Sequence, residues 1–124
     1  MEEEKKYSIS HPSLYPSVAI LDGNLTLSLP LDISISTVMD ALSHSFESIW
    51  NKKANHKSTD FAISAICSIL ENGPALKENP DDLDTRNNLL KAATVAGLAF
   101  SNTTTAAAHS MSYPLPIHLS LIHI

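Results

Sequence analysis

Between residues 34 and 103, apolar side chains recur every three or four positions, the spacing that places them on one face of an α-helix. Residues 7–33 differ, because three prolines interrupt them, so an extended segment with a turn at 22–24 is expected there. The predicted fold is therefore mainly α, a helical bundle over 34–124 preceded by a short extended segment over 1–33. The expected helices cover about 34–51, 58–73, 80–101 and 104–113.

Capping residues and helix breakers set the predicted boundaries. Ser34 or Ser36 can cap the first helix, and Ser58 is expected to cap the second. Gly73-Pro74 is expected to end the second helix, because proline has no amide hydrogen and glycine favours the position after a helix. The third helix is predicted to open at Pro80-Asp81-Asp82.

Composition excludes several functional classes. The chain has 124 residues, 44% of them hydrophobic and 17% charged, which suits one small domain or a piece of a larger one. Its net charge is −5 with eight Lys and Arg, so neither nucleic acid nor a membrane is an expected partner. No run is long enough to span a membrane and no leader follows Met1, so a cytoplasmic location is expected. The single cysteine, Cys67, lies in the apolar stretch 61–70 and is predicted to be a buried thiol.

Asp40 and His44 lie four residues apart on the first predicted helix, so they project from the same face one turn apart. That spacing suits two ligands of one metal ion. The same face also carries Thr37, Glu47 and Asn51, and a solvated polar stripe is the alternative interpretation.

His109 follows small residues that would let its helix pack closely against a neighbour. Alone, it could be a buried histidine bonded to a carbonyl group. With Asp40, His44 and His123, it completes a set of three imidazoles and one carboxylate, which suits iron(II) or zinc. The other histidines in polar segments, at positions 11 and 56, are expected to be solvated.

Two stretches resemble a known family. Residues 38–47, Val-Met-Asp-Ala-Leu-Ser-His-Ser-Phe-Glu, resemble the metal-binding helix of the iron-containing alcohol dehydrogenases, in which Asp-Ala-Leu-x-His-x-x-Glu recurs. Residues 96–115 resemble the segment of that family that carries the third ligand, and 16–30 resemble the stretch that leads out of its cofactor domain. The sequence of residues 45–51 is similar to that of a branch of this family that reduces phosphonoacetaldehyde.

This resemblance implies the dehydroquinate synthase-like fold of that family, with Asp40, His44 and His109 as metal ligands and His123 as the fourth. The family usually ends this segment with His-x-Gly-x-Pro-His-Gly, whereas residues 118–124 read His-Leu-Ser-Leu-Ile-His-Ile. The histidine spacing is kept, while both glycines and the proline are lost. Two interpretations stay open: His123 is the fourth ligand, or residues 119–124 are a non-native tail.

The implied activity is hydride transfer between NAD(P) and an alcohol or aldehyde bound to a divalent ion, Fe2+ or Zn2+. No two of the three glycines are close together, so this chain is not expected to contain a dinucleotide-binding loop. It is interpreted as the helical domain of a two-domain enzyme, with NAD(P) held mainly upstream and Met1 as an internal or artificial start. A homodimer of the full-length enzyme stays open. Glu47 is expected at the helix surface or behind the ligands.

Two other classes stay open on the residues alone. One is a non-catalytic helical interaction module, in which the ligand residues serve as ordinary packing. The other is a metal-dependent hydrolase, in which a bound water attacks an ester or phosphate. The sequence upstream of Met1 would discriminate between them, because a strand followed by a glycine cluster favours the dehydrogenase.

Overall fold

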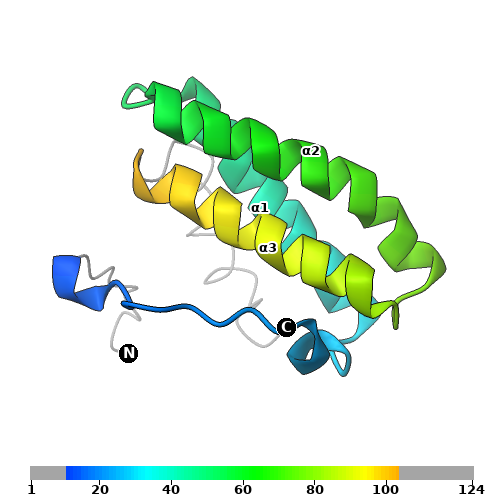
Figure 1. Cartoon of the computed structure of the whole chain (residues 1–124). Helices are drawn as coiled ribbons and strands as arrows, with labels where there is room; N and C mark the ends of the chain where they lie inside the picture. Colours follow the sequence, from blue (N-terminus) through cyan, green and yellow to red (C-terminus); the bar gives the residue numbers. More distant parts are fainter. Residues whose placement is uncertain (1–10, 104–124) are drawn as a thin grey trace, which may run out of the picture.

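The computed structural model describes residues 11–103 (Figure 1). Within this range the chain forms helices and no strand, so the prediction of a mainly α fold is confirmed. Two short 3-10 helices come first, and three long α-helices follow. The elements are η1 (Pro12–Leu14), η2 (Gly23–Thr26), α1 (Leu31–Trp50), α2 (His56–Glu78) and α3 (Leu83–Ser101). No helix in the described part of the chain is long and apolar enough to cross a membrane.

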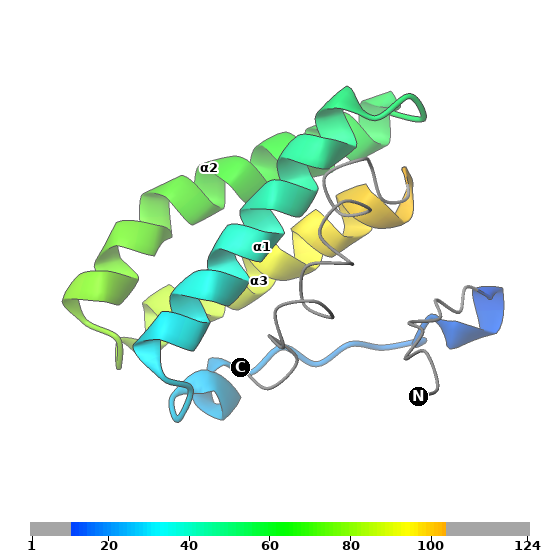
Figure 2. The ribbon, with the colours of Figure 1, turned by 180° about the vertical axis from the view of Figure 1, so that it is seen from behind.

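The three long helices lie side by side, and short loops make each one antiparallel to the next (Figures 1 and 2). Helix α1 contacts both α2 and α3, so the three form one small bundle. The segment between η1 and η2 is extended and runs beside the bundle, and η2 packs against α3 close to the start of α1 (Figure 1). The turn expected at 22–24 is therefore confirmed as the start of η2.

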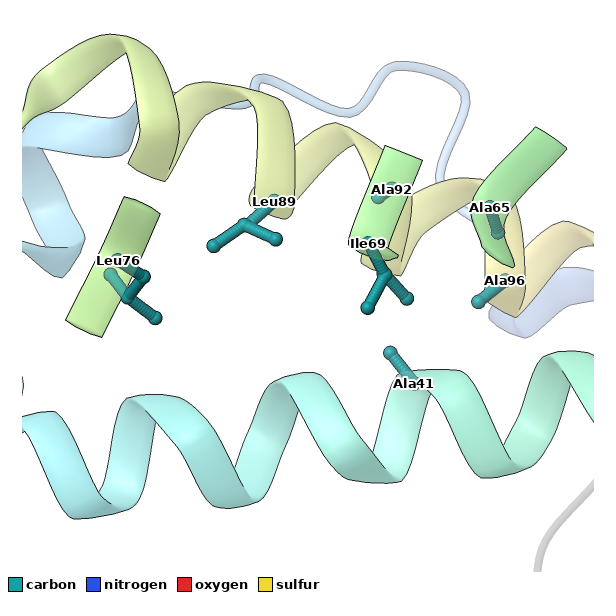
Figure 3. Packing of buried hydrophobic residues seen from close by; sticks show 7 residues of the cluster. All are labelled: Ala41, Ala65, Ile69, Leu76, Leu89, Ala92 and Ala96. Atoms are coloured by element: carbon teal, nitrogen blue, oxygen red, sulfur yellow. The ribbon is translucent and has the colours of Figure 1, made fainter. Parts of the chain in front are cut away.

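The core is built mainly from small residues. Its members point toward one another between the helices: Ala41, Ala65, Ile69, Leu76, Leu89, Ala92 and Ala96 (Figure 3). Because alanine reaches only one carbon beyond the backbone, these positions let the helix axes approach closely. Val38 and Leu42 pack against the edge of this cluster, as their helical spacing predicts.

Helix α1 begins three residues before the predicted cap. Pro30 takes the N-cap position with φ of −53°, and no side chain caps the helix. The predicted cap at Ser34 or Ser36 is therefore wrong. Both serines lie inside the helix, and the Ser34 hydroxyl donates to the carbonyl oxygen of Pro30 at 3.0 Å. Asp32 in the first turn favours this early start, because a carboxylate interacts well with the positive end of the helix dipole.

Both predicted ends of α2 are wrong as well. Asn55 is the N-cap, and Ser58 is its reciprocal partner: the Asn55 side chain accepts from the Ser58 amide at 3.1 Å, and the Ser58 hydroxyl accepts from the Asn55 amide at 2.9 Å. At the other end, the helix continues through Pro74 to Glu78. An internal proline costs about 3 kcal/mol. Beyond it, Leu76 is 2% exposed, and burial of a leucine is worth about 1.5–3 kcal/mol, enough to offset much of that cost.

The predicted start of α3 is confirmed, because Asp82 is its N-cap and accepts from the Thr85 amide at 2.9 Å. The prediction of a buried Cys67 is wrong, since the residue is exposed on α2. Its neighbours on the same side of the helix, Ile63 and Leu70, are also exposed. The stretch 61–70 is apolar on more than one face, so its composition alone did not indicate which face meets the core.

Candidate metal centre

Asp40 and His44 lie together on α1, as their spacing predicts. Oδ2 of Asp40 is 3.3 Å from Nε2 of His44. Ligand distances of about 2.0–2.2 Å put two donor atoms of one metal ion roughly 3 Å apart, and the observed separation fits this requirement. The Asp40 side chain is 62% exposed and that of His44 is 22% exposed, so the pair is open to solvent on the carboxylate side.

The imidazole of His44 is packed against an aromatic ring from α3. The ring centroids of His44 and Phe100 are 4.7 Å apart, with an angle of 55° between the ring planes. This contact comes from a residue 56 positions away, so helical spacing on α1 could not indicate it. It restricts the rotation of the imidazole, and Nε2 stays directed toward Asp40.

A group of buried polar residues lies next to this pair, toward the C-terminal end of α1. Glu47 and Ser48 are each 1% exposed, and Ser45 and Thr103 are fully buried. The Thr103 hydroxyl lies 3.5 Å from that of Ser48, which brings the residues after α3 against α1. Of the two positions expected for Glu47, its burial excludes the helix surface and leaves the position behind the ligands as a prediction.

The remaining predicted ligands, His109 and His123, lie outside the described residues. Over residues 11–103 no group of three or more His, Cys, Asp or Glu side chains is arranged to hold a metal ion, so the described part contributes the Asp40–His44 pair. His11 and His56 are exposed, as predicted.

A pocket of about 180 Å³ lies one turn before Asp40, between the end of η2 and the link that follows it, the first half of α1, Leu76 of α2 and the first half of α3. Thr37 and Val38 line it from α1, and Leu90 and Ala93 line it from α3. Neither Asp40 nor His44 is among the described residues that line this pocket. The most polar side chain in its wall is Arg86, which the sequence analysis did not single out.

Comparisons with known proteins identify the family to which the chain is similar. Residues 34–124 match the C-terminal part of the Fe-containing alcohol dehydrogenase family. An aldehyde-alcohol dehydrogenase of Streptococcus pneumoniae is 34% identical over 96% of this chain and 13% of its own length. A probable alcohol dehydrogenase, EutG, of Salmonella typhimurium is 34% identical over 96% of this chain and 30% of its own length.

Solved structures show the same fold. Sulfoacetaldehyde reductase from Bifidobacterium kashiwanohense, in complex with NAD+, superimposes with a TM-score of 0.82 at 34% identity, over 87% of this chain and 29% of the reductase. Maleylacetate reductase from Agrobacterium tumefaciens gives a TM-score of 0.85 at 25% identity, over 90% of this chain and 32% of the reductase. The chain thus spans about a third or less of each relative. From the matched region and its fold, we conclude that the chain belongs to the iron-containing alcohol dehydrogenase family and corresponds to its C-terminal part.

Proposed function

We propose that this chain is the metal-binding helical part of an NAD(P)-dependent alcohol dehydrogenase or aldehyde reductase. The observation that carries the proposal is the approach of Asp40 Oδ2 and His44 Nε2 to 3.3 Å on α1, inside the region that matches the family. In this proposal His109 and His123 supply the remaining ligands. The names of the relatives support a small alcohol or aldehyde as the substrate class.

Each described residue of the centre has a separate role. Asp40 supplies an anionic oxygen, which lowers the net charge of a site built around a divalent cation. His44 supplies a neutral imidazole nitrogen, which suits Fe2+ and Zn2+. Phe100 packs against the imidazole and holds it in the orientation that the site needs.

A bound Fe2+ or Zn2+ would supply Lewis acidity at the substrate oxygen, and NAD(P), held mainly by the rest of the longer protein, would exchange the hydride. The part of the centre described here is exposed on the Asp40 side, which leaves room for a substrate to approach. The His44 side is packed against α3, which limits the access of water from that direction.

The metal content of the purified 124-residue chain tests the proposal. One divalent ion per chain is expected after loading with Zn2+ and removal of excess metal, because the proposed ligands form one mononuclear site. Asp40→Ala, His44→Ala and His109→Ala should each lose the ion. The exposed histidines provide matched controls, so His11→Ala and His56→Ala should keep it. Full occupancy in the Asp40 and His109 variants would refute the ligand assignment.

His123→Ala addresses the fourth position separately. Loss or weakening of the ion in this variant identifies His123 as a ligand. Unchanged affinity supports the interpretation of residues 119–124 as a non-native tail and leaves three protein ligands.

A further inference from the structure

Arg86 is a buried cation in the first turn of α3. Arg86 is only 4% exposed, although arginine is rarely buried without a charged partner. A cation is also unfavourable near the N-terminus of a helix, where the helix dipole is positive. Neither local preference explains this position, so its explanation must come from contacts with other parts of the chain.

All the acceptors that Arg86 meets in the described part of the chain are neutral oxygens. Nε donates to the carbonyl oxygen of Pro80 at 2.5 Å. Nη1 donates to the carbonyl oxygen of Thr26 and, at 3.4 Å, to the hydroxyl of Ser34. Nη2 donates to the carbonyl oxygen of Leu29 at 3.4 Å. Three backbone carbonyls and one hydroxyl thus accept hydrogen bonds from the guanidinium.

Three of the four acceptors lie on the chain that leads into the metal-binding helix or at the start of that helix. Thr26 ends η2, Leu29 lies in the link that follows, and Ser34 is in the first turn of α1. The next residue on α3 reinforces the attachment, because Oδ1 of Asn87 accepts from the Gly23 amide at 2.8 Å. Arg86 and Asn87 therefore join the start of α1 to the start of α3, and we call this set of contacts the Arg86 latch.

The latch bears on the candidate metal centre because α1 is a continuous helix from Leu31 to Trp50. Ser34 and Asp40 are six residues apart, about 9 Å along the helix axis, and a helix of this kind transmits an axial shift with little loss. Asp40 and His44 are on α1, whereas the next proposed ligand, His109, follows α3 in the chain. The register between α1 and α3 also sets the packing of the His44 imidazole on Phe100, because these two rings come one from each helix.

We infer that Arg86 is a positioning residue for the metal centre: it holds α1 in register with α3, so that His44 keeps its packing against Phe100 and its orientation toward Asp40. This inference rests on the proposed function. Only a planar group with five donors can bond several carbonyls at once in fixed directions, and the single ammonium of lysine cannot reproduce that arrangement. Arg86→Lys therefore keeps the charge and breaks the register.

Metal affinity and stability, measured separately on the full 124-residue chain, test the inference. The dissociation constant for Zn2+ is measured by competition with a chelator, at a temperature at which circular dichroism shows each variant to be folded. Leu89→Ala is the matched control, because it removes core packing one turn further along α3, and Leu89 takes part in none of the hydrogen bonds of Arg86. Both variants should be less stable than the wild type in the absence of metal. Only Arg86→Lys should lose metal affinity, by about tenfold or more, the usual effect of disturbing the residues that orient metal ligands.

Each outcome is decisive. If Arg86→Lys binds Zn2+ as tightly as Leu89→Ala does, Arg86 is only a stabilising residue. The inference is then overturned, while the proposed function stands. If the wild-type chain binds no metal, the proposed function fails and the inference fails with it. Should Arg86→Lys not fold, Asn87→Ala removes one bond from the same latch, and a smaller loss of affinity is expected. Unchanged affinity in that folded variant would overturn the inference.

Discussion

The amide nitrogen of Gly23 lies 2.8 Å from Oδ1 of Asn87, and this hydrogen bond joins η2 to α3 across 64 positions of sequence. Gly23 is buried there, and the approach is close. A Cβ atom on Gly23 would come within 2.7 Å of Asn87 Oδ1 and within 3.1 Å of the Asn87 backbone nitrogen. Because backbone as well as side-chain atoms are in the way, the position requires glycine.

We expect Gly23→Ala to destabilise the chain by about 1–3 kcal/mol, the usual cost of forcing extra atoms into a packed region. Gly97→Ala on α3 is the matched control, since a Cβ there meets nothing within 4 Å. It should stabilise the chain by about 0.5–1 kcal/mol, because alanine favours the helix. Urea unfolding measures both free energies. Effects of the same sign would contradict the role given to Gly23.

Part of the loss of stability that we expect in acid comes from Asp82, the N-cap residue of α3. Hydrogen bonds from Thr85, through its side chain and then its backbone amide, hold the pKa of Asp82 below its ordinary value near 3.8. A lowered pKa in the folded state means that the stabilisation is present above the ordinary value and is lost as the pH falls through the folded pKa. The free energy of unfolding of Asp82→Asn should therefore depend less steeply on pH below about 4 than that of the wild type.

Asp81→Asn, one position earlier, caps no helix and is the control for this measurement. It should keep the steeper acid dependence of the wild type. Equal slopes for Asp82→Asn and the wild type would show that the cap at α3 does not contribute to acid stability.

An exposed apolar stripe on α1 predicts association of the isolated chain. Ile35, Met39, Phe46 and Trp50 share one side of α1, and their exposed fractions run from 37% to 66%. The rings of Phe46 and Trp50 are stacked, with centroids 6.0 Å apart. Large exposed apolar patches drive association in water.

Sedimentation velocity over a range of concentrations should therefore show oligomers of the wild-type chain and fewer for Trp50→Lys. Ser64→Lys adds the same charge at an exposed polar position on α2 and should leave the oligomers in place. A monomeric wild-type chain at all concentrations would show that the stripe is too small to drive association.

The isolated chain should show no appreciable NAD(P)-dependent turnover, even with its ligands intact. Hydride transfer requires the nicotinamide and the substrate carbon in near-attack geometry, and a misplacement of 1 Å costs about a hundredfold in rate. The measurement is NAD(P)H consumption with Zn2+ or Fe2+ and a panel of short aldehydes. A longer protein that adds an upstream nucleotide-binding domain should restore activity. Robust turnover by the isolated chain would mean that it binds the cofactor by itself.

The sequence predicted where the helices lie better than it predicted where they begin and end. The spacing of Val38 and Leu42 placed α1, because burial of one face is a local property of the pattern. The end of α2 was not predictable in the same way. The rule that proline ends a helix is local, whereas the continuation through Pro74 depends on Leu76, which packs into a core contributed by other helices.

The same distinction applies to the candidate site. The Asp40–His44 pair could be predicted, since residues four apart on a helix always share a face. The His44–Phe100 contact and the Arg86 latch could not, because each joins positions more than fifty residues apart and depends on how α1 and α3 pack. The assignments of His109 and His123 stay predictions.

The Arg86 latch also has a consequence for the order of folding. Its bonds to Thr26, Leu29 and Ser34 close loops of 60, 57 and 52 residues, whereas α2 and α3 are neighbours joined by a short turn. Long loops lose more chain entropy on closing, so we expect the latch to form after the α1–α2 and α2–α3 helix pairs, each of which is joined by a short loop. Contacts that form after the rate-limiting barrier hold the native state mainly by slowing unfolding. Breakage of the latch is therefore expected to raise the unfolding rate and to leave the refolding rate nearly unchanged, so these contacts prolong the lifetime of the folded chain more than they speed its formation.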